Sequence, residues 1–218
     1  PASVLDGSSV HMARLRAGRQ LAKEYPIEAD VAVGVPDSGA GPAMGYAEES
    51  GIPYGMGFLK NKYIGRTFIA PNQSQRENDV RIKLSPIAAT IAGKRVVMVD
   101  DSIVRGTTSL KIIKLVREAG AKEVHMLLSC PPFLYPCHFG TDIDSSENLI
   151  AYKHTVEEIR QIIGADTLGY LSIEALKTLA PECGLGFCDG CFTGNYPVPP
   201  PPLAEKNRFE QKLPPQED

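Results

Sequence analysis

The sequence predicts an α/β fold with a mostly parallel, doubly wound sheet and helices on both of its faces. Apolar strand patterns alternate with helical patterns between residues 8 and 129, and this alternation is typical of parallel sheets joined by right-handed crossovers. The strand patterns are continuous apolar runs rather than alternating ones, as in strands that are covered on both faces. A hydrophobic content of 43% supplies enough apolar surface for such a core.

The first half of the pattern consists of four elements and a loop. A helix is expected over 8–24, opened by Ser8 or Ser9. The apolar run 30–36 predicts a strand closed by Pro36, and a turn from Ser38 leads into a helix that stops at Gly51. A second strand is expected over 54–59, followed by a long loop over 60–75.

The secondary-structure signal is stronger in the second half of the pattern, because the strands expected there are more apolar. Helical patterning is expected over 75–84 and 86–92, a buried strand over 95–99, a helix over 106–119 and a strand over 123–129. After residue 140 the pattern predicts short helices at 155–163 and 172–179 and a strand at 166–171. We therefore divide the chain into a core (1–150), a helical, cysteine-rich extension (151–196) and a proline-rich tail (197–218), expected to be extended or disordered.

Composition excludes several classes of protein. The 218 residues carry a formal net charge of −3, which argues against a nucleic-acid binder. No apolar run approaches the roughly 18 residues that cross a bilayer, and the opening PASVLDGSSV lacks the pattern of a signal peptide. Five cysteines are too few for a disulfide scaffold and leave one thiol over. We expect neither nucleic acid nor membrane as a partner, and a reducing, cytoplasmic location.

The run VVMVDDSIVRGTTS (96–109) carries the strongest functional signal. An apolar strand ends in Asp100 and Asp101, and a loop then opens a helix. Ligands of open α/β sheets bind at the carboxyl ends of strands. Gly106 and the hydroxyls of Thr107–Ser109 lie at a helix N-terminus, which suits a phosphate. Two carboxylates beside them can accept hydrogen bonds from a sugar diol, so the run predicts a site for a ribose 5-phosphate.

Simpler interpretations exist for parts of this run. A solvated acidic pair and a cluster of N-capping hydroxyls would explain the stretch GTTS alone. A Walker loop is excluded because no G-K-[ST] occurs, and DSGAGPAMG (37–45) only approximates G-x-G-x-x-G.

The whole run resembles the phosphoribosyl pyrophosphate (PRPP) motif of type I phosphoribosyltransferases. Its wording DDSIVRGTTS is similar to that of the glutamine PRPP amidotransferase (amidophosphoribosyltransferase) family. The resemblance covers nearly the whole chain except the tail. It continues through VPDSG (35–39), KNKYIGRTFI (60–69), VRIKL (80–84), REAGAKEVH (117–125), YPCHFGTDI (135–143), VEEIRQIIGADTL (156–168) and FCDGCFTGNYP (187–197).

The resemblance implies the type I phosphoribosyltransferase fold and a reaction in which ammonia displaces pyrophosphate from PRPP to give 5-phosphoribosylamine. It implies Mg²⁺ near Ser38, Asp100 and Asp101, held largely by substrate and water. The implied PRPP-binding residues are Pro36, Asp37, Ser38 and Gly39 in the pyrophosphate loop, together with Asp100, Asp101, Ser102, Arg105, Gly106, Thr107, Thr108 and Ser109.

A flexible loop that closes over PRPP and excludes water is also implied. It contains Lys60, Lys62, Tyr63 and Arg66; on composition alone, this segment reads as a basic surface loop. Arg76, Arg81 and Lys83 are further candidates for phosphate contacts, although a solvated helix face explains them as well. Arg105 could equally be structural.

The C-x-x-C of Cys188 and Cys191 lets two thiolates reach one metal or cluster, and by itself leaves zinc, iron–sulfur and redox chemistry open. The resemblance implies a [4Fe–4S] cluster on Cys137, Cys188 and Cys191, with the family's remaining ligand lying before residue 1. Cys130 is interpreted as core, Cys183 as a weaker substitute ligand, and His138 as structural.

Full-length members of this family begin with a glutaminase domain, which is expected to precede the present chain. The resemblance further implies inhibition by AMP and GMP and a homo-oligomer. Two alternatives remain: a salvage phosphoribosyltransferase, although no base-binding hood is recognisable, and a regulator that binds PRPP or nucleotides without catalysis.

Overall fold

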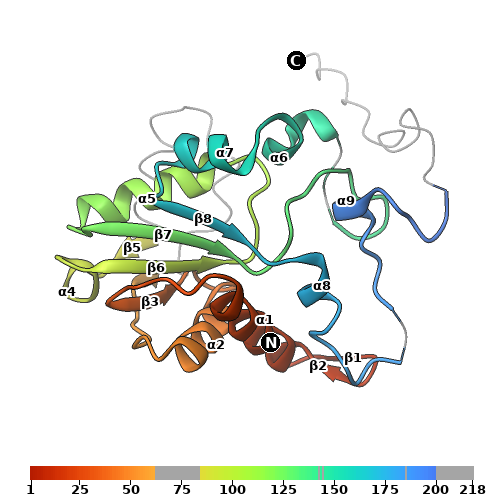
Figure 1. Ribbon diagram of the computed structural model, residues 1–218, viewed down its shortest axis with the longest axis horizontal. Helices are drawn as coiled ribbons and strands as arrows, with labels where there is room; N and C mark the ends of the chain where they lie inside the picture. Colours follow the sequence, from red (N-terminus) through yellow and green to blue (C-terminus); the bar gives the residue numbers. More distant parts are fainter. Residues whose placement is uncertain (62–83, 142, 144, 185, 200–218) are drawn as a thin grey trace, which may run out of the picture.

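The fold is a central parallel sheet covered by helices on both faces, which confirms the expected class (Figure 1). The structure is a computed structural model that describes residues 1–61, 84–141, 143, 145–184 and 186–199. Helices α1 (Val10–Glu24) and α2 (Ala40–Ser50) cover one face, and α5 (Thr107–Glu118) and α7 (Val156–Ile163) cover the other. Within the described residues, no helix is both long and apolar enough to cross a membrane.

The main sheet has the strand order β3–β6–β7–β8, and all of its strands are parallel. They are β3 (Val31–Gly34), β6 (Arg95–Asp100), β7 (Glu123–Leu128) and β8 (Thr167–Tyr170). Gly34 pairs with Val99, Asp100 with Leu128, and Leu128 with Tyr170. The carboxyl ends of the strands therefore lie at one edge of the sheet, and the segments that follow them gather there.

The helices begin and end at residues that the sequence marks. The Ser9 side chain accepts a hydrogen bond from the Met12 N–H at the start of α1. Gly51 ends α2 in the left-handed conformation, with φ 75°, which glycine adopts without strain. Thr155 and Glu158 form a reciprocal capping box at the start of α7.

The other elements of the described residues are smaller. They are β1 (Val4–Leu5), β2 (Ser8–Ser9), β4 (Phe58–Lys60), β5 (Leu84–Pro86), α4 (Ala88–Ile91), η2 (Ser146–Asn148), α6 (Ile150–Lys153), α8 (Ile173–Leu176) and α9 (Gly190–Thr193). β1 and β2 form a hairpin, and β4 pairs with β5 in a separate antiparallel pair.

Four expected elements differ from the structure. The strand expected over 54–59 is shorter, because Gly55 and Gly57 pack against the side chains of β3 and only Tyr54 forms an isolated bridge to Ala32. The helix expected over 86–92 is the four-residue α4, and that over 172–179 is the four-residue α8. Of the helix expected over 75–84, only Leu84 is described, and it begins a strand. The rest of that segment and most of the tail lie outside the described residues.

Residues after 150 pack with those before it. β8 pairs with β7, and Ile159 and Ile163 of α7 belong to the same buried cluster as Val96 and Met98 of β6. The division of the chain at residue 150 stays a prediction about its boundaries.

Candidate functional site

The loop between β3 and α2 is held tightly against the end of β6. The Val35 N–H donates to the Val99 carbonyl at 2.9 Å, and the Gly39 N–H donates to the Val35 carbonyl at 2.9 Å. A Cβ on Gly39 would come within 2.2 Å of the Val99 carbonyl oxygen, so only glycine fits here. The Pro36–Asp37 peptide bond is cis. Residues Pro36–Gly39 therefore form a fixed turn beside the end of the neighbouring strand.

The two carboxylates at the end of β6 differ in exposure. Asp100 is 8% exposed, whereas Asp101 is exposed. Burial and the neighbouring charge of Asp101 raise the pKa of Asp100 to about 8, although the Asp101 N–H donates a hydrogen bond to its Oδ1 at 2.8 Å. A divalent cation would stabilise both ionised carboxylates, and oxygen ligands of this kind are those that Mg²⁺ prefers.

The segment after Asp101 presents a helix N-terminus. Gly106 is the N-cap of α5 and has φ 78°. The Val104 carbonyl accepts a hydrogen bond from the Ile150 N–H at 2.8 Å, which fastens the loop to α6. Thr107 and Thr108 are exposed, and Ser109 is buried. The free N–H groups and hydroxyls at the start of this 12-residue helix are suited to a phosphate monoester.

One cation, at the last residue of β4, reaches this edge of the sheet. The Lys60 ammonium forms an ion pair with the Asp37 carboxylate. Arg105 is exposed. Tyr63 and Arg66, together with Lys62, Arg76, Arg81 and Lys83, lie outside the described residues. The structure thus brings the 36–39 loop and Lys60 to the same sheet edge as the carboxylates and the helix N-terminus.

The cysteine-rich part forms a separate region. The Cys191 carbonyl accepts hydrogen bonds from the N–H groups of Leu134 and Tyr135, each at 3.0 Å, and the Tyr196 hydroxyl donates to the Pro136 carbonyl at 2.6 Å. These bonds bring α9 alongside the segment that contains Cys137. Cys137 and Cys191 are 54 positions apart in the chain.

The thiols of this region differ in acidity. Burial would raise the pKa of Cys137, but N–H groups of Gly140, Phe139 and Thr141 donate to its sulfur and lower the pKa to about 7. Burial and the nearby Cys137 raise the pKa of Cys191 to about 11. All five cysteines lie in the described part of the chain, and none of them forms a disulfide. Among the described residues, no three His, Cys, Asp or Glu side chains are placed to hold one metal ion.

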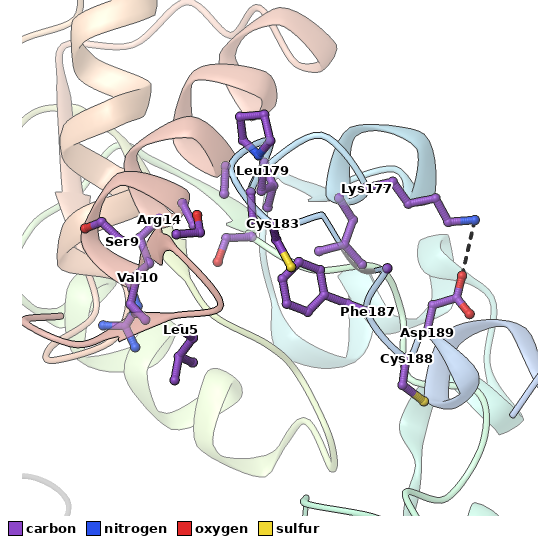
Figure 2. Close-up of a pocket in the computed structure, with 18 of the residues that line it drawn as sticks. Leu5, Ser9, Val10, Arg14, Lys177, Leu179, Cys183, Phe187, Cys188 and Asp189 are labelled. Atoms are coloured by element: carbon purple, nitrogen blue, oxygen red, sulfur yellow. Dashed lines mark ion pairs between the residues drawn. The ribbon is translucent and has the colours of Figure 1, made fainter. Parts of the chain in front are cut away.

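A further feature is a cavity of about 660 Å³ between the two ends of the described chain (Figure 2). The β1–β2 hairpin and the start of α1 form one side, and residues from 176–183 and 186–192 form the other. Phe187 and Cys183 point into it, and an ion pair of 3.2 Å between Lys177 and Asp189 lies at its rim. No local pattern signals this cavity, because its walls are remote in sequence.

The comparisons with known proteins agree with this geometry. Residues 5–134 match the family described as the phosphoribosyl transferase domain. The chain belongs to the phosphoribosyltransferase family. The matched segment of this phosphoribosyltransferase chain includes the 36–39 loop and the whole run from Asp100 to Ser109.

Curated relatives are named amidophosphoribosyltransferase. The protein of Bacillus subtilis is 55% identical over 202 residues, which are 91% of this phosphoribosyltransferase chain and 42% of the relative. That of Archaeoglobus fulgidus is 53% identical over 92% of this chain and 44% of its own length. A chloroplastic relative from Glycine max is 52% identical over 94% of this chain and 36% of its own. The chain thus spans about two fifths of the length of these relatives.

Solved structures show the same likeness. The phosphoribosyltransferase chain superposes with a TM-score of 0.81 on glutamine PRPP amidotransferase from B. subtilis complexed with ADP and GMP, at 55% identity. The match covers 90% of this chain and 44% of that one. A second structure, described as the allosteric regulatory enzyme of purine biosynthesis, gives a TM-score of 0.81 at 54% identity, covering 90% and 43% of the two chains. These matches confirm the predicted resemblance and the type I phosphoribosyltransferase fold.

Proposed function

We propose that this chain is the transferase part of an amidophosphoribosyltransferase, and that it displaces pyrophosphate from PRPP with ammonia to form 5-phosphoribosylamine, the first step of de novo purine nucleotide biosynthesis. The observation that carries the proposal is the gathering of three features at one sheet edge: the 36–39 loop, the Asp100–Asp101 pair and the N-terminus of α5. Relatives of that name, 52–55% identical, support the choice of reaction.

Each feature has a part of PRPP to bind. The N–H groups and hydroxyls of Gly106–Ser109 would bind the 5-phosphate, with Ser102 and Arg105 beside them. Asp100 and Asp101 would accept hydrogen bonds from the ribose hydroxyls. Pro36–Gly39 would hold the pyrophosphate. Bound in this way, the ribose would be held with its C1 atom beside the pyrophosphate loop.

In the reaction, the bond from C1 to the pyrophosphate oxygen breaks and a bond from C1 to the ammonia nitrogen forms, after which the nitrogen loses a proton. Negative charge grows on the pyrophosphate, so positioned cations speed the step. Lys60 is one such group near the loop, and Tyr63 and Arg66 are proposed to act there as well. Mg²⁺ held by Ser38, Asp100 and Asp101 would neutralise part of this charge when bound.

The proposed ligands of an iron–sulfur cluster in this chain are Cys137, Cys188 and Cys191. The lowered pKa of Cys137 suits a thiolate ligand, and Cys137 and Cys188 both lie close enough to Cys191 to raise its pKa. Among the described residues, however, no three such side chains are placed to hold one metal ion. A [4Fe–4S] cluster completed by a ligand from outside this chain stays a prediction.

The same relatives support proposals about the regulation and the assembly of this chain. A related enzyme has been solved in complex with ADP and GMP, and we propose that purine nucleotides such as AMP and GMP bind to and inhibit this chain. A glutaminase domain that supplies the ammonia, a homo-oligomeric assembly and a cytoplasmic location also belong to the proposal; the relatives include chloroplastic proteins.

The test is release of pyrophosphate from PRPP by this chain with Mg²⁺ and ammonia. We expect ammonia-dependent release that is lost in Asp100→Asn and Asp101→Asn and retained in Glu28→Gln, an exposed side chain beside Arg95 at the opposite edge of the sheet. Release that requires a nucleobase instead of ammonia would identify a salvage enzyme. Binding of PRPP without release would identify a regulator.

A further inference from the structure

The candidate pyrophosphate loop contains a carboxylate, which is unexpected in a site for a highly charged anion. The Asp37 side chain is 71% exposed and forms an ion pair with Lys60, whose side chain is 30% exposed. Among the described candidate residues, the other exposed carboxylate at this sheet edge is Asp101, because Asp100 is buried. A bare anion that binds to the 36–39 loop therefore meets the Asp37 carboxylate as well as the Lys60 ammonium.

The loop that carries the Asp37 carboxylate is held in place by its backbone. Backbone hydrogen bonds from Val35 to Val99 and from Gly39 to Val35 hold the turn on both sides of Asp37, and Gly39 is in close contact with the end of β6. Lys60 ends β4, where it pairs with Leu84 of β5. The ion pair therefore joins two separately anchored segments, and an anion bound to the loop stays close to the Asp37 carboxylate.

Two effects follow for pyrophosphate. Without a metal it must approach the Asp37 charge and compete with that carboxylate for the Lys60 ammonium. A magnesium ion on the pyrophosphate removes two units of negative charge and is itself attracted to carboxylates. The same residue therefore opposes the bare anion more than the magnesium complex.

We propose that Asp37 is a specificity-determining residue that makes the site select the magnesium complex of the pyrophosphate group over the metal-free anion. This inference rests on the proposed function, because it takes the 36–39 loop as the pyrophosphate site. In the ligand-free protein Asp37 neutralises Lys60; Lys60 becomes available to the substrate as the metal-bound pyrophosphate enters.

The experiment is titration calorimetry of inorganic pyrophosphate into this chain, once with Mg²⁺ in excess and once with a chelator. For each variant the measured quantity is the ratio of the two affinities. In Asp37→Asn we expect the affinity for metal-free pyrophosphate to rise about tenfold relative to the affinity for the magnesium complex. Glu28→Gln, which removes an equal charge at the far edge of the sheet, should keep the wild-type ratio within twofold.

A double-mutant cycle tests the part played by the ion pair. Lys60→Gln should weaken metal-free binding more in the Asp37→Asn background than in the wild type, because Lys60 is then no longer shared with Asp37. Equal effects in the two backgrounds, or an unchanged ratio in Asp37→Asn while pyrophosphate still binds, would overturn this inference and leave the proposed function intact. Absence of pyrophosphate binding in every variant under both conditions would overturn both.

Discussion

The side chain of Ile150 lies directly against Gly106, so that a Cβ on Gly106 would come within 2.6 Å of Ile150 Cδ1. Gly106 also has φ 78°, a conformation that other residues adopt only with strain. Two independent requirements for glycine thus meet at the N-cap of the helix that is proposed to bind the 5-phosphate.

Gly106→Ala should lower the free energy of unfolding by about 2–4 kcal/mol, the sum of the strained backbone and the displaced Ile150. Urea unfolding measures this loss. Gly164→Ala is a matched control, because Gly164 has φ 75° but nothing within 4 Å of its Cβ position, and it should lose only about 1 kcal/mol. Equal losses in the two variants would show that contact with Ile150 does not matter.

The raised pKa of Asp100 predicts a pH dependence of stability. Asp100 holds its proton in the folded protein up to about pH 8, whereas in the unfolded chain it ionises near pH 4. Between these values the folded state binds more protons, so the free energy of unfolding should fall as pH rises from 4 to 8. Asp100→Asn should remove this fall and be more stable than the wild type at pH 8.5, by on the order of 3 kcal/mol.

Urea unfolding at pH 5 and pH 8.5, with magnesium chelated, checks this expectation. Asp101→Asn should reduce the fall without abolishing it, because it removes the neighbouring charge and leaves Asp100 buried. If Asp100→Asn and the wild type showed the same change between the two pH values, burial of Asp100 would not govern its ionisation.

The thiols should differ in reactivity. Because the pKa of Cys137 is lowered to about 7 and that of Cys191 is raised to about 11, at pH 7.5 iodoacetamide should alkylate Cys137 faster than Cys191, by at least tenfold. Mass spectrometry of peptides from the reduced, metal-free chain measures both rates in one sample. The Cys137 rate should rise with pH around 7. Faster alkylation of Cys191 would contradict the hydrogen-bonded placement of the Cys137 sulfur.

Two glycines in helices are explained by contact between α1 and α2. A Cβ on Gly45 would lie 2.0 Å from the Leu15 carbonyl oxygen, and one on Gly18 would lie 1.8 Å from that of Pro42. Gly45→Ala should therefore destabilise the protein by about 2–4 kcal/mol, although alanine favours a helix by about 1 kcal/mol.

Thermal unfolding followed by circular dichroism measures this effect. Gly41→Ala in the same helix meets only the Arg14 side chain, at 3.1 Å, and should change stability by less than about 1 kcal/mol. A stabilised Gly45→Ala variant would mean that helix propensity outweighs the close packing.

The strands of the main sheet and their parallel direction could be predicted from the sequence, because continuous apolar runs and helix caps are local signals. Arg95–Asp100 and the capped helix Val156–Ile163 lie within a residue of their predicted bounds. The short elements could not be predicted as well. A strand is expected over 54–59, but Gly55 and Gly57 in this segment pack against Val31 and Val33. That contact depends on residues more than twenty positions away.

For the candidate site, the sequence by itself determined three parts: the carboxylate pair, the proposed phosphate-binding helix N-terminus and the 36–39 loop. Each is a continuous segment whose residue types indicate its chemistry. Only the tertiary structure decided how these segments meet. Three features depend on contacts between segments that are distant in the chain: the burial of Asp100, the ion pair of Asp37 with Lys60 and the cavity near Phe187. Tyr25 illustrates the same limit: its hydroxyl bonds the backbone of Tyr170 on the edge strand, and no local pattern encodes a contact that exists only once the sheet has formed.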